Sequence, residues 1–341
     1  MNEPRTTKNE KRKTNDGISK MLSARLIMAP MAGVTDGPFR LMVRRHGCLF
    51  AFTEMIDSTG LVYRSKKTLD MLDHPPEDSP LGVQISGNDP DKVLYTALIC
   101  EEKGFDVIDL NAGCPAPKVV KGGKGAALLK EPSKIAAIVR KLATKLKTPV
   151  TVKMRIGWDD SSMNYVEVAK AAEGEGARAI CVHPRTREQM YKGSVDHGIV
   201  GEVKSFVKVP VFASGNIFSP EDAEKALSLT GCDGVFMARG ALGRPWIFRE
   251  TYERLNGDKA EYVPSLEELK TAMIEHFELS FGEFGFERAR PRMYKNICWY
   301  LKRYKGLNEI MKEYTRLGDI DAFRAFVSRL VPGNGKYLVL A

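Results

Sequence analysis

The chain has 341 residues, of which 43% are hydrophobic and 28% charged, a composition typical of a globular protein with a full-sized core. Its formal net charge of +9 favours anionic partners such as nucleic acid. No apolar run reaches the roughly 20 residues of a membrane span, and the N-terminus lacks the basic-then-apolar order of a signal peptide. The six cysteines are scattered and form no Cys-x-x-Cys pair, which argues against a disulfide framework and a zinc site. We therefore expect a reduced, cytoplasmic monomer without a bound metal or a membrane contact.

The first 22 residues predict a disordered basic tail. Cations outnumber acids in this segment, and hardly any apolar side chain precedes Ile18. Such a segment cannot bury enough apolar surface to fold by itself. We assign it no function.

From Arg25 to about Arg244 the chain repeats one pattern, in which a short apolar run precedes a polar stretch and a helical segment. Apolar runs of this length that alternate with helices, such as 133–146 and 220–229, are typical of a parallel sheet covered by helices. Eight such units predict an α/β fold, a (β/α)₈ TIM barrel, within a domain of residues 23–250. The predicted strands are Leu26–Pro30, Leu49–Thr53, Leu81–Ile85, Val107–Leu110, Val150–Met154, Ala179–Val182, Val211–Ala213 and Val235–Met237.

After Trp246 the pattern changes to helices alone, which predicts a smaller all-helical C-terminal domain over residues 260–341. Helices are expected at 266–277 and at about 288–304. The second is amphipathic, and no acidic residue occurs between Arg288 and Lys305. Such a cationic face suits RNA phosphates, although a merely solvated face is an equal alternative. The side expected to pack carries Met293, Ile297, Tyr300, Leu301 and Tyr304, and the basic side carries Arg292, Lys295, Trp299 and Lys302.

Polar and glycine residues follow nearly every predicted strand, where the reactive groups of such a barrel lie. The loops after the seventh and eighth strands predict an anion site, because Gly215 and Gly240 allow close backbone approach and Arg239 supplies charge. The loop after His183 carries Arg185 and Arg187, which favours a phosphate or RNA contact.

Two residues on this rim have more than one chemical interpretation. Lys153, at the end of the fifth strand, could form a Schiff base or act as a fixed cation beside an electron-rich ring. Cys114 lies on a loop between Gly113 and Pro115 instead of within an apolar run. A thiol is mostly protonated at neutral pH, so Cys114 could serve either as an acid or as a nucleophile.

The chain resembles the tRNA-dihydrouridine synthases of the bacterial type. The likeness extends over nearly the whole chain after residue 24. The motifs that carry it are Met28–Asp36 with Pro38-Phe39-Arg40, Asp109–Pro115 with Lys118-Val119, Val152-Lys153-Met154-Arg155, His183–Arg187 and Gly243–Phe248.

The resemblance implies tightly bound FMN at the top of the barrel, with NADPH as the reductant. Gln84 and Lys153 would lie at the polar edge of the flavin ring, where Lys153 stabilises negative charge on the reduced ring. Residues implied to touch the ring face are Pro30, Met31 and Ala32. Those implied to hold the ribityl phosphate are Ser214, Gly215, Asn216, Ala238 and Arg239, with His183 nearby.

The resemblance also implies the reaction. Reduced FMN would transfer a hydride to C6 of a uracil, Cys114 would protonate C5, and the target base would leave its stack. The tRNA contacts are expected at Asn111, Lys118, Arg155, Arg185, Arg187, Arg292 and Lys295. Two alternatives are a flavin reductase for a small pyrimidine or enone, and an RNA-binding protein that has lost its chemistry.

Overall fold

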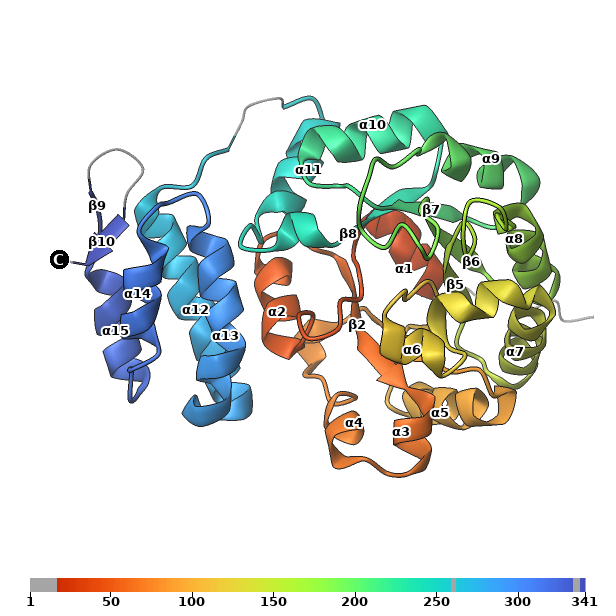
Figure 1. Cartoon of the computed structure of the whole chain (residues 1–341), viewed down its shortest axis with the longest axis horizontal. Helices are drawn as coiled ribbons and strands as arrows, with labels where there is room; N and C mark the ends of the chain where they lie inside the picture. The colour runs from red at the N-terminus through yellow and green to blue at the C-terminus, as the bar shows by residue number, and fades with distance from the viewer. Residues whose placement is uncertain (1–16, 259–261, 334–337, 341) are drawn as a thin grey trace, which may run out of the picture.

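A computed structural model describes residues 17–258, 262–333 and 338–340. Eight parallel strands pair in chain order and close into a barrel, with β8 beside β1, which confirms the predicted fold (Figure 1). The strands are β1 (Leu26–Met28), β2 (Phe50–Asp57), β3 (Leu81–Ser86), β4 (Val107–Ala112), β5 (Val150–Arg155), β6 (Ala179–His183), β7 (Val211–Ser214) and β8 (Gly234–Met237).

Helices cover the outside of the barrel, and their apolar faces pack against the strands. Several begin at clear signals: Ser219 and Asp222 form a capping box at α10, and α5 begins with an Asp89 cap followed by Pro90. The barrel helices are α2 (Gly37–Arg45), α3 (Ser58–Val62), α4 (Lys66–Asp70), α5 (Pro90–Glu102), α6 (Pro117–Lys121), α7 (Pro132–Lys145), α8 (Tyr165–Gly174), α9 (Gly198–Phe206), α10 (Pro220–Thr230) and α11 (Ile247–Leu255), with short 3-10 turns η1 (Pro76–Asp78), η2 (Gly125–Lys130) and η3 (Arg239–Ala241).

The predicted disordered tail is wrong for residues 17–22, because they belong to helix α1 (Gly17–Ala24). Ile18, Met21 and Ala24 are buried in a cluster with inward-facing strand residues such as Phe212. Gly17 lies against the backbone of Asp106, just before β4. The helix therefore covers the amino-terminal end of the barrel. The rest of the predicted tail, residues 1–16, lies outside the described residues.

The C-terminal region has its own core, in which Phe277 stacks on Phe323 with ring centroids 4.0 Å apart. Its helices are α12 (Leu266–Phe284), α13 (Phe286–Leu301), α14 (Leu307–Tyr314) and α15 (Ile320–Ser328). The prediction of helices alone is incomplete, since β9 (Leu330–Pro332) and β10 (Leu338–Leu340) form an antiparallel pair. Within the described ranges no helix is both long and apolar enough to cross a membrane.

Helix α13 is amphipathic as predicted. Met293, Ile297, Tyr300 and Leu301 are buried, whereas Arg292, Lys295 and Lys302 are exposed. Trp299, predicted on the basic side, is half-buried, and its backbone lies against Gly243 of the barrel.

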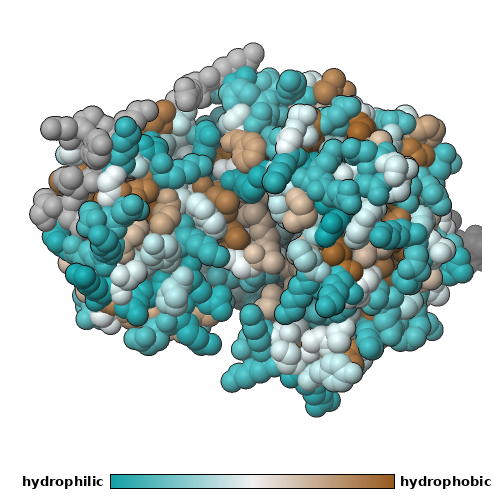
Figure 2. Space-filling model, viewed as in Figure 1, coloured by the Kyte–Doolittle hydropathy of each residue, from teal (hydrophilic) through white to brown (hydrophobic). Residues whose placement is uncertain are grey.

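The C-terminal helices pack beside α2, with α12 against it (Figure 1). Arg292 of α13 reaches Asp36, with Nη1 3.8 Å from Oδ2, and its guanidinium lies 4.1 Å from the ring of Phe284. Figure 2 shows hydrophilic side chains over most of this face, and more hydrophobic ones in the hollow between the C-terminal helices and the barrel.

Asp36 caps α2 by accepting a hydrogen bond from the amide of Phe39 at 3.1 Å. Burial, aided by the charge of Glu54, raises the pKa of Asp36 to about 6, although the Phe39 amide and nearby arginines oppose this shift. Because the pKa of this carboxyl is higher in the folded than in the unfolded protein, its protonated form stabilises the fold. This contribution is fully present below the unfolded pKa and is lost as the pH rises through about 6.

We expect Asp36→Asn to keep the cap and remove this pH dependence. Between pH 4 and pH 7.5 the free energy of unfolding of the variant should rise relative to wild type by up to about 3 kcal/mol. Urea unfolding of both proteins at the two pH values measures the difference. Asp319→Asn makes the same substitution at the exposed cap of α15 and is the matched control. An Asp36→Asn difference that does not change with pH would contradict the assignment.

Candidate active site

A cavity of about 460 Å³ opens at the carboxyl ends of the barrel strands. It brings together the predicted catalytic residue, all eleven predicted cofactor residues, and two of the predicted tRNA contacts. These residues are Pro30, Met31, Ala32, Gln84, Asn111, Cys114, Lys153, Arg155, His183, Ser214, Gly215, Asn216, Ala238 and Arg239.

The cavity combines apolar walls with positive charge. Met31, Met55 and Phe236 contribute apolar surface, and Lys153, Arg155 and Arg239 are its charged residues. None of the described residues that line it is an aspartate or a glutamate. Such a site suits a ligand with a flat apolar part and an anionic group.

The anionic group fits best beside β7 and β8. Gly215 and Asn216 both have positive φ, +97° and +52°, which turns the backbone sharply after β7. A Cβ at Gly215 would lie 2.7 Å from the ring of His183, so only glycine fits there. Arg239 donates to Oδ1 of Asn216 at 3.3 Å, which places its guanidinium on the same corner.

His183 is held neutral at this corner. Burial, followed by the charges of Lys153, Arg155, Arg185 and Arg239, lowers its pKa well below the usual value. Nη1 of Arg185 lies 3.1 Å from Nε2 of His183, and because arginine can only donate, Nε2 must accept. The ring proton is therefore on Nδ1, where it can serve as a donor.

The structure removes Arg185 from the predicted tRNA contacts. Its side chain is only 1% exposed. The guanidinium donates to the carbonyls of Lys192 at 3.0 Å and Gly193 at 2.7 Å, and to Asn216 Oδ1 at 3.0 Å. Arg185 therefore supports the corner from behind, and it does not face solvent where RNA could reach it.

Lys153 points into the cavity from β5. Its Nζ lies 3.4 Å from Oγ of Ser214 and 5.9 Å from the centre of the Phe236 ring. The ammonium group therefore lies between the anion corner and the middle of the cavity.

The loop that carries Cys114 is tied down on both sides. Oδ1 of Asn111 accepts from the amides of Gly113 at 3.1 Å and Cys114 at 2.9 Å. Nε of Arg155 donates to the carbonyl of Gly113 at 2.8 Å, and the amide of Ala126 donates to the carbonyl of Cys114 at 3.0 Å. A half-buried thiol is thus presented to the cavity from a fixed backbone.

Arg155 is buried, with Nη1 donating to the carbonyl of Thr186 at 2.8 Å. Burial lowers its pKa to about 10, so it stays charged at neutral pH. It both lines the cavity and braces the Cys114 loop.

Besides Arg185, four of the predicted tRNA contacts lie outside the cavity. Lys118 is exposed on α6, and Arg292 and Lys295 are exposed on α13. Arg187 lies above Trp158, with Cζ 4.8 Å from the ring centroid, and Nζ of Lys130 lies 3.6 Å from the same centroid. Neither Lys130 nor Arg187 has a carboxylate partner among the described residues.

Sequence reasoning missed the aromatic residues of the cavity. Tyr191 is 53% exposed at its mouth, and its ring lies 5.4 Å from Cζ of Arg155 and 5.5 Å from Cζ of Arg239. Phe218 faces Arg239 at 4.9 Å. Nothing in the local sequence marks these side chains, which lie nine residues (Tyr191) and five residues (Phe218) after the predicted strands that precede them.

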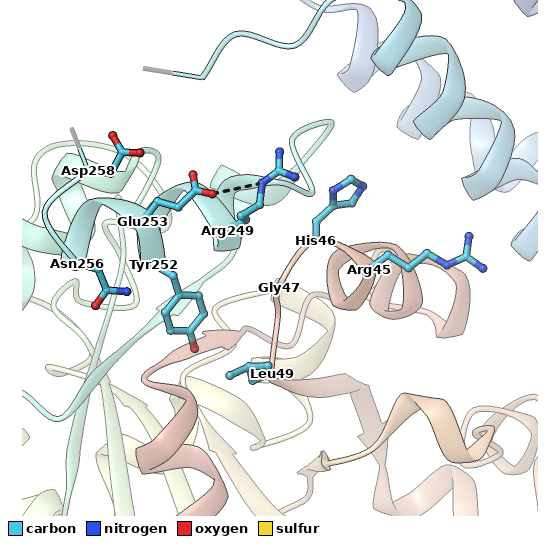
Figure 3. Close-up of a pocket in the computed structure, with 9 residues that line it drawn as sticks. All are labelled: Arg45, His46, Gly47, Leu49, Arg249, Tyr252, Glu253, Asn256 and Asp258. Carbon is cyan, nitrogen blue, oxygen red and sulfur yellow. Dashed lines mark ion pairs between the residues drawn. The ribbon is translucent and has the colours of Figure 1, made fainter. Parts of the chain in front are cut away.

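A second cavity, of about 510 Å³, lies between the end of α2 and α11 (Figure 3). Leu49, which precedes β2, places it toward the amino-terminal end of the barrel, opposite to Cys114. Its arginines already have acidic partners: Arg249 lies 3.8 Å from Glu253, and Arg45 lies 3.4 Å from Glu275. The positive charges of this second cavity are therefore compensated by nearby glutamates, unlike those of the first cavity.

Comparison with known proteins identifies the family of the chain. The family model of the dihydrouridine synthases (Dus) matches residues 27–326. The chain is 41% identical to tRNA-dihydrouridine synthase B of Pseudomonas aeruginosa over 88% of this chain and 91% of that protein. It is 39% identical to tRNA-dihydrouridine synthase B of Vibrio vulnificus over 87% of this chain and 92% of that protein.

Among solved structures, histamine dehydrogenase from Rhizobium sp. 4-9 matches with a TM-score of 0.51 at 13% identity. The match covers 75% of this chain and 49% of that one, and it shows a shared fold alone. The family match over residues 27–326 and the near-complete alignment with the two relatives decide the assignment. The chain belongs to the dihydrouridine synthase family.

Proposed function

We propose that this protein reduces uridine in tRNA to 5,6-dihydrouridine, with FMN in the cavity and Cys114 as the proton donor. The observation that carries the proposal is the placement of Cys114 on a braced loop, within a cavity that has cationic and apolar walls and no carboxylate among the described residues that line it. The names of the relatives support tRNA as the substrate.

The described residues fit FMN. A phosphate would be held by Arg239, the backbone at Gly215 and Nδ1 of His183, because the described residues that line this corner include no carboxylate to neutralise the charge of Arg239. The ring would lie against Met31, with Gln84 and Lys153 at its polar edge. When bound there and reduced by NADPH, FMN would supply the hydride for C6 of the uracil.

The residues of the chain supply the proton and the positioning. Cys114 gives a proton to C5, and its loop stays fixed because Asn111 and Arg155 hold the backbone of Gly113. Lys153 stabilises negative charge in the cavity, and a half-buried thiol on a braced loop meets less competition from bulk water than an exposed one would.

The tRNA would lie across the exposed face of α13 and the rim that carries Arg187. A reductase of free pyrimidines would need neither of these two basic surfaces. Lys295 is the clearest test on α13, because it is exposed and has no acidic partner in the part of the chain that the structure describes, whereas Arg292 lies near Asp36.

We expect Lys295→Ala to weaken tRNA binding similarly for all tRNA sequences. The slope of log affinity against log salt concentration should fall in magnitude by about 0.7 to 0.9, as for the loss of one phosphate contact. Filter binding at several salt concentrations measures it. Lys312→Ala, which removes an exposed cation already paired with Glu309 at 2.7 Å, is the control. An unchanged slope for Lys295→Ala would exclude this contact.

The proposed function is tested by mapping dihydrouridine, position by position, in tRNA from cells with and without the gene. Loss of dihydrouridine at defined positions, restored by the wild-type gene, is the expected result. Unchanged dihydrouridine at every position would refute the proposal.

A further inference from the structure

Three polar side chains lie together inside the barrel, on β3, β4 and β5. Gln84 of β3 pairs in register with Asp109 of β4, which pairs with Thr151 of β5, so the three side chains point to the same side of the sheet. Gln84 and Asp109 are each 2% exposed, and Thr151 is 3% exposed. A carboxylate so deeply buried is costly unless hydrogen bonds compensate for the lost water.

These side chains form a continuous chain of hydrogen bonds that ends at the Cys114 loop. Oδ1 of Asp109 accepts from Oγ1 of Thr151 at 2.7 Å, and Oδ2 accepts from Nε2 of Gln84 at 2.7 Å. Oε1 of Gln84 accepts from Nδ2 of Asn111 at 2.6 Å. Oδ1 of Asn111 then accepts from the amides of Gly113 and Cys114.

The direction of every bond in this chain follows from its two ends. An ionised carboxylate can only accept, so the NH₂ group of Gln84 must face Asp109. The backbone amides of Gly113 and Cys114 can only donate, so the oxygen of Asn111 must face the loop. Only one orientation of the two amide side chains satisfies both ends at once.

Asp109 is suited to be the fixed acceptor. Burial raises its pKa to about 6, but the hydrogen bonds from Thr151 and Gln84 and the charge of Lys153 oppose the shift. The carboxyl is therefore ionised at neutral pH. Lys153 of β5 is the charged side chain that faces it, and the thiol of Cys181 on β6 is also close enough to interact with it.

We propose that Asp109 is a positioning residue, which acts through Gln84 and Asn111 to hold the Cys114 loop in its reactive position. The inference rests on the proposed function, because it is there that Cys114 is the proton donor. Asp109 itself touches neither the substrate nor the thiol. Its role is to fix the orientation of two amide groups.

The test is amide hydrogen exchange of the segment containing Gly113 and Cys114, measured by mass spectrometry on the full chain. Asp109→Leu cannot accept a hydrogen bond, so exchange in this segment should rise about tenfold, the factor that one hydrogen bond of typical strength supplies. Asp109→Asn can present its oxygen to Gln84 and its nitrogen to the hydroxyl of Thr151. It should therefore exchange as wild type does.

Exchanging the donor and acceptor groups of residues 84 and 109 tests whether the orientation of these side chains matters, and not merely their packing. Gln84→Glu places a second acceptor opposite Asp109, so the hydrogen bond between residues 84 and 109 is lost. Amide exchange of the loop should therefore rise as it does in Asp109→Leu. In the double variant Asp109→Asn with Gln84→Glu, the new amide can donate to the new carboxylate, which still accepts from Asn111. Exchange should return to within about twofold of wild type, because every bond again has one donor and one acceptor. Thr96→Val, which removes a buried hydroxyl on α5 outside the chain, should leave loop exchange unchanged.

Rescue by the double variant supports the positioning role. The role is overturned if Gln84→Glu alone raises loop exchange and the double variant does not restore it. If Asp109→Leu does not fold, the Gln84→Glu pair still decides the question. Exchange requires no turnover, so rescue in a protein that forms no dihydrouridine would uphold the positioning role and count against the proposed function alone. With active enzyme, Asp109→Leu should lower kcat about 10- to 100-fold with little change in tRNA affinity, as expected for a misplaced reactive group.

Discussion

Replacement of Cys114 by alanine is expected to lower the rate of dihydrouridine formation by about 10²- to 10⁴-fold, the range that a positioned general acid contributes. In the proposed function the thiol of the braced loop donates the proton, and alanine keeps the backbone bonds that Asn111 and Ala126 make to this residue. The variant should therefore fold and bind tRNA normally. Single-turnover assays with saturating tRNA measure the chemical step.

Cys298→Ala is the matched control, because Cys298 is a half-buried cysteine on α13, outside the lining of the cavity. It should retain the wild-type rate. A Cys114→Ala variant with wild-type turnover would show that another group protonates C5.

Arg239→Ala should lower the affinity for FMN by about 10- to 100-fold, the effect of losing a charge-assisted hydrogen bond to a phosphate. Arg239 lies at the corner formed by β7 and β8, and its guanidinium is held by Asn216 and flanked by Tyr191 and Phe218. The neighbouring backbone keeps its shape without this side chain. The loss should therefore appear in binding rather than in stability.

Titration of flavin-free protein with FMN, followed by flavin fluorescence, measures this affinity. Lys225→Ala, which removes an exposed cation from α10, is the control and should bind FMN as wild type does. Equal FMN affinity in Arg239→Ala and wild type would place the phosphate elsewhere.

The sequence predicted the barrel well because its strands are apolar on both faces and its helices begin at clear caps. The prediction for β2 stopped at Thr53 although the strand continues to Asp57, since the apolar run is interrupted by Glu54. Helix α1 was missed because it is short, and its stability comes from burial against the end of a closed barrel. That contact depends on tertiary structure.

The cavity could be predicted in part from the predicted order of the strands. Residues at the carboxyl ends of parallel strands must meet on one rim, so Lys153, His183 and Arg239 could be grouped from their positions alone. No comparable rule predicts where a side chain on a loop points. Arg185 and Arg187 are two residues apart, yet one is buried behind the anion corner and the other lies over Trp158.

The most direct test of the account uses purified protein, NADPH and unmodified tRNA, with mass spectrometry of the digested RNA. Wild-type protein should convert uridine at a defined position into a product heavier by two hydrogens, and Cys114→Ala should form it at least about a hundredfold more slowly. An FMN-loaded wild-type protein that leaves every uridine of its natural tRNA unchanged would contradict the account.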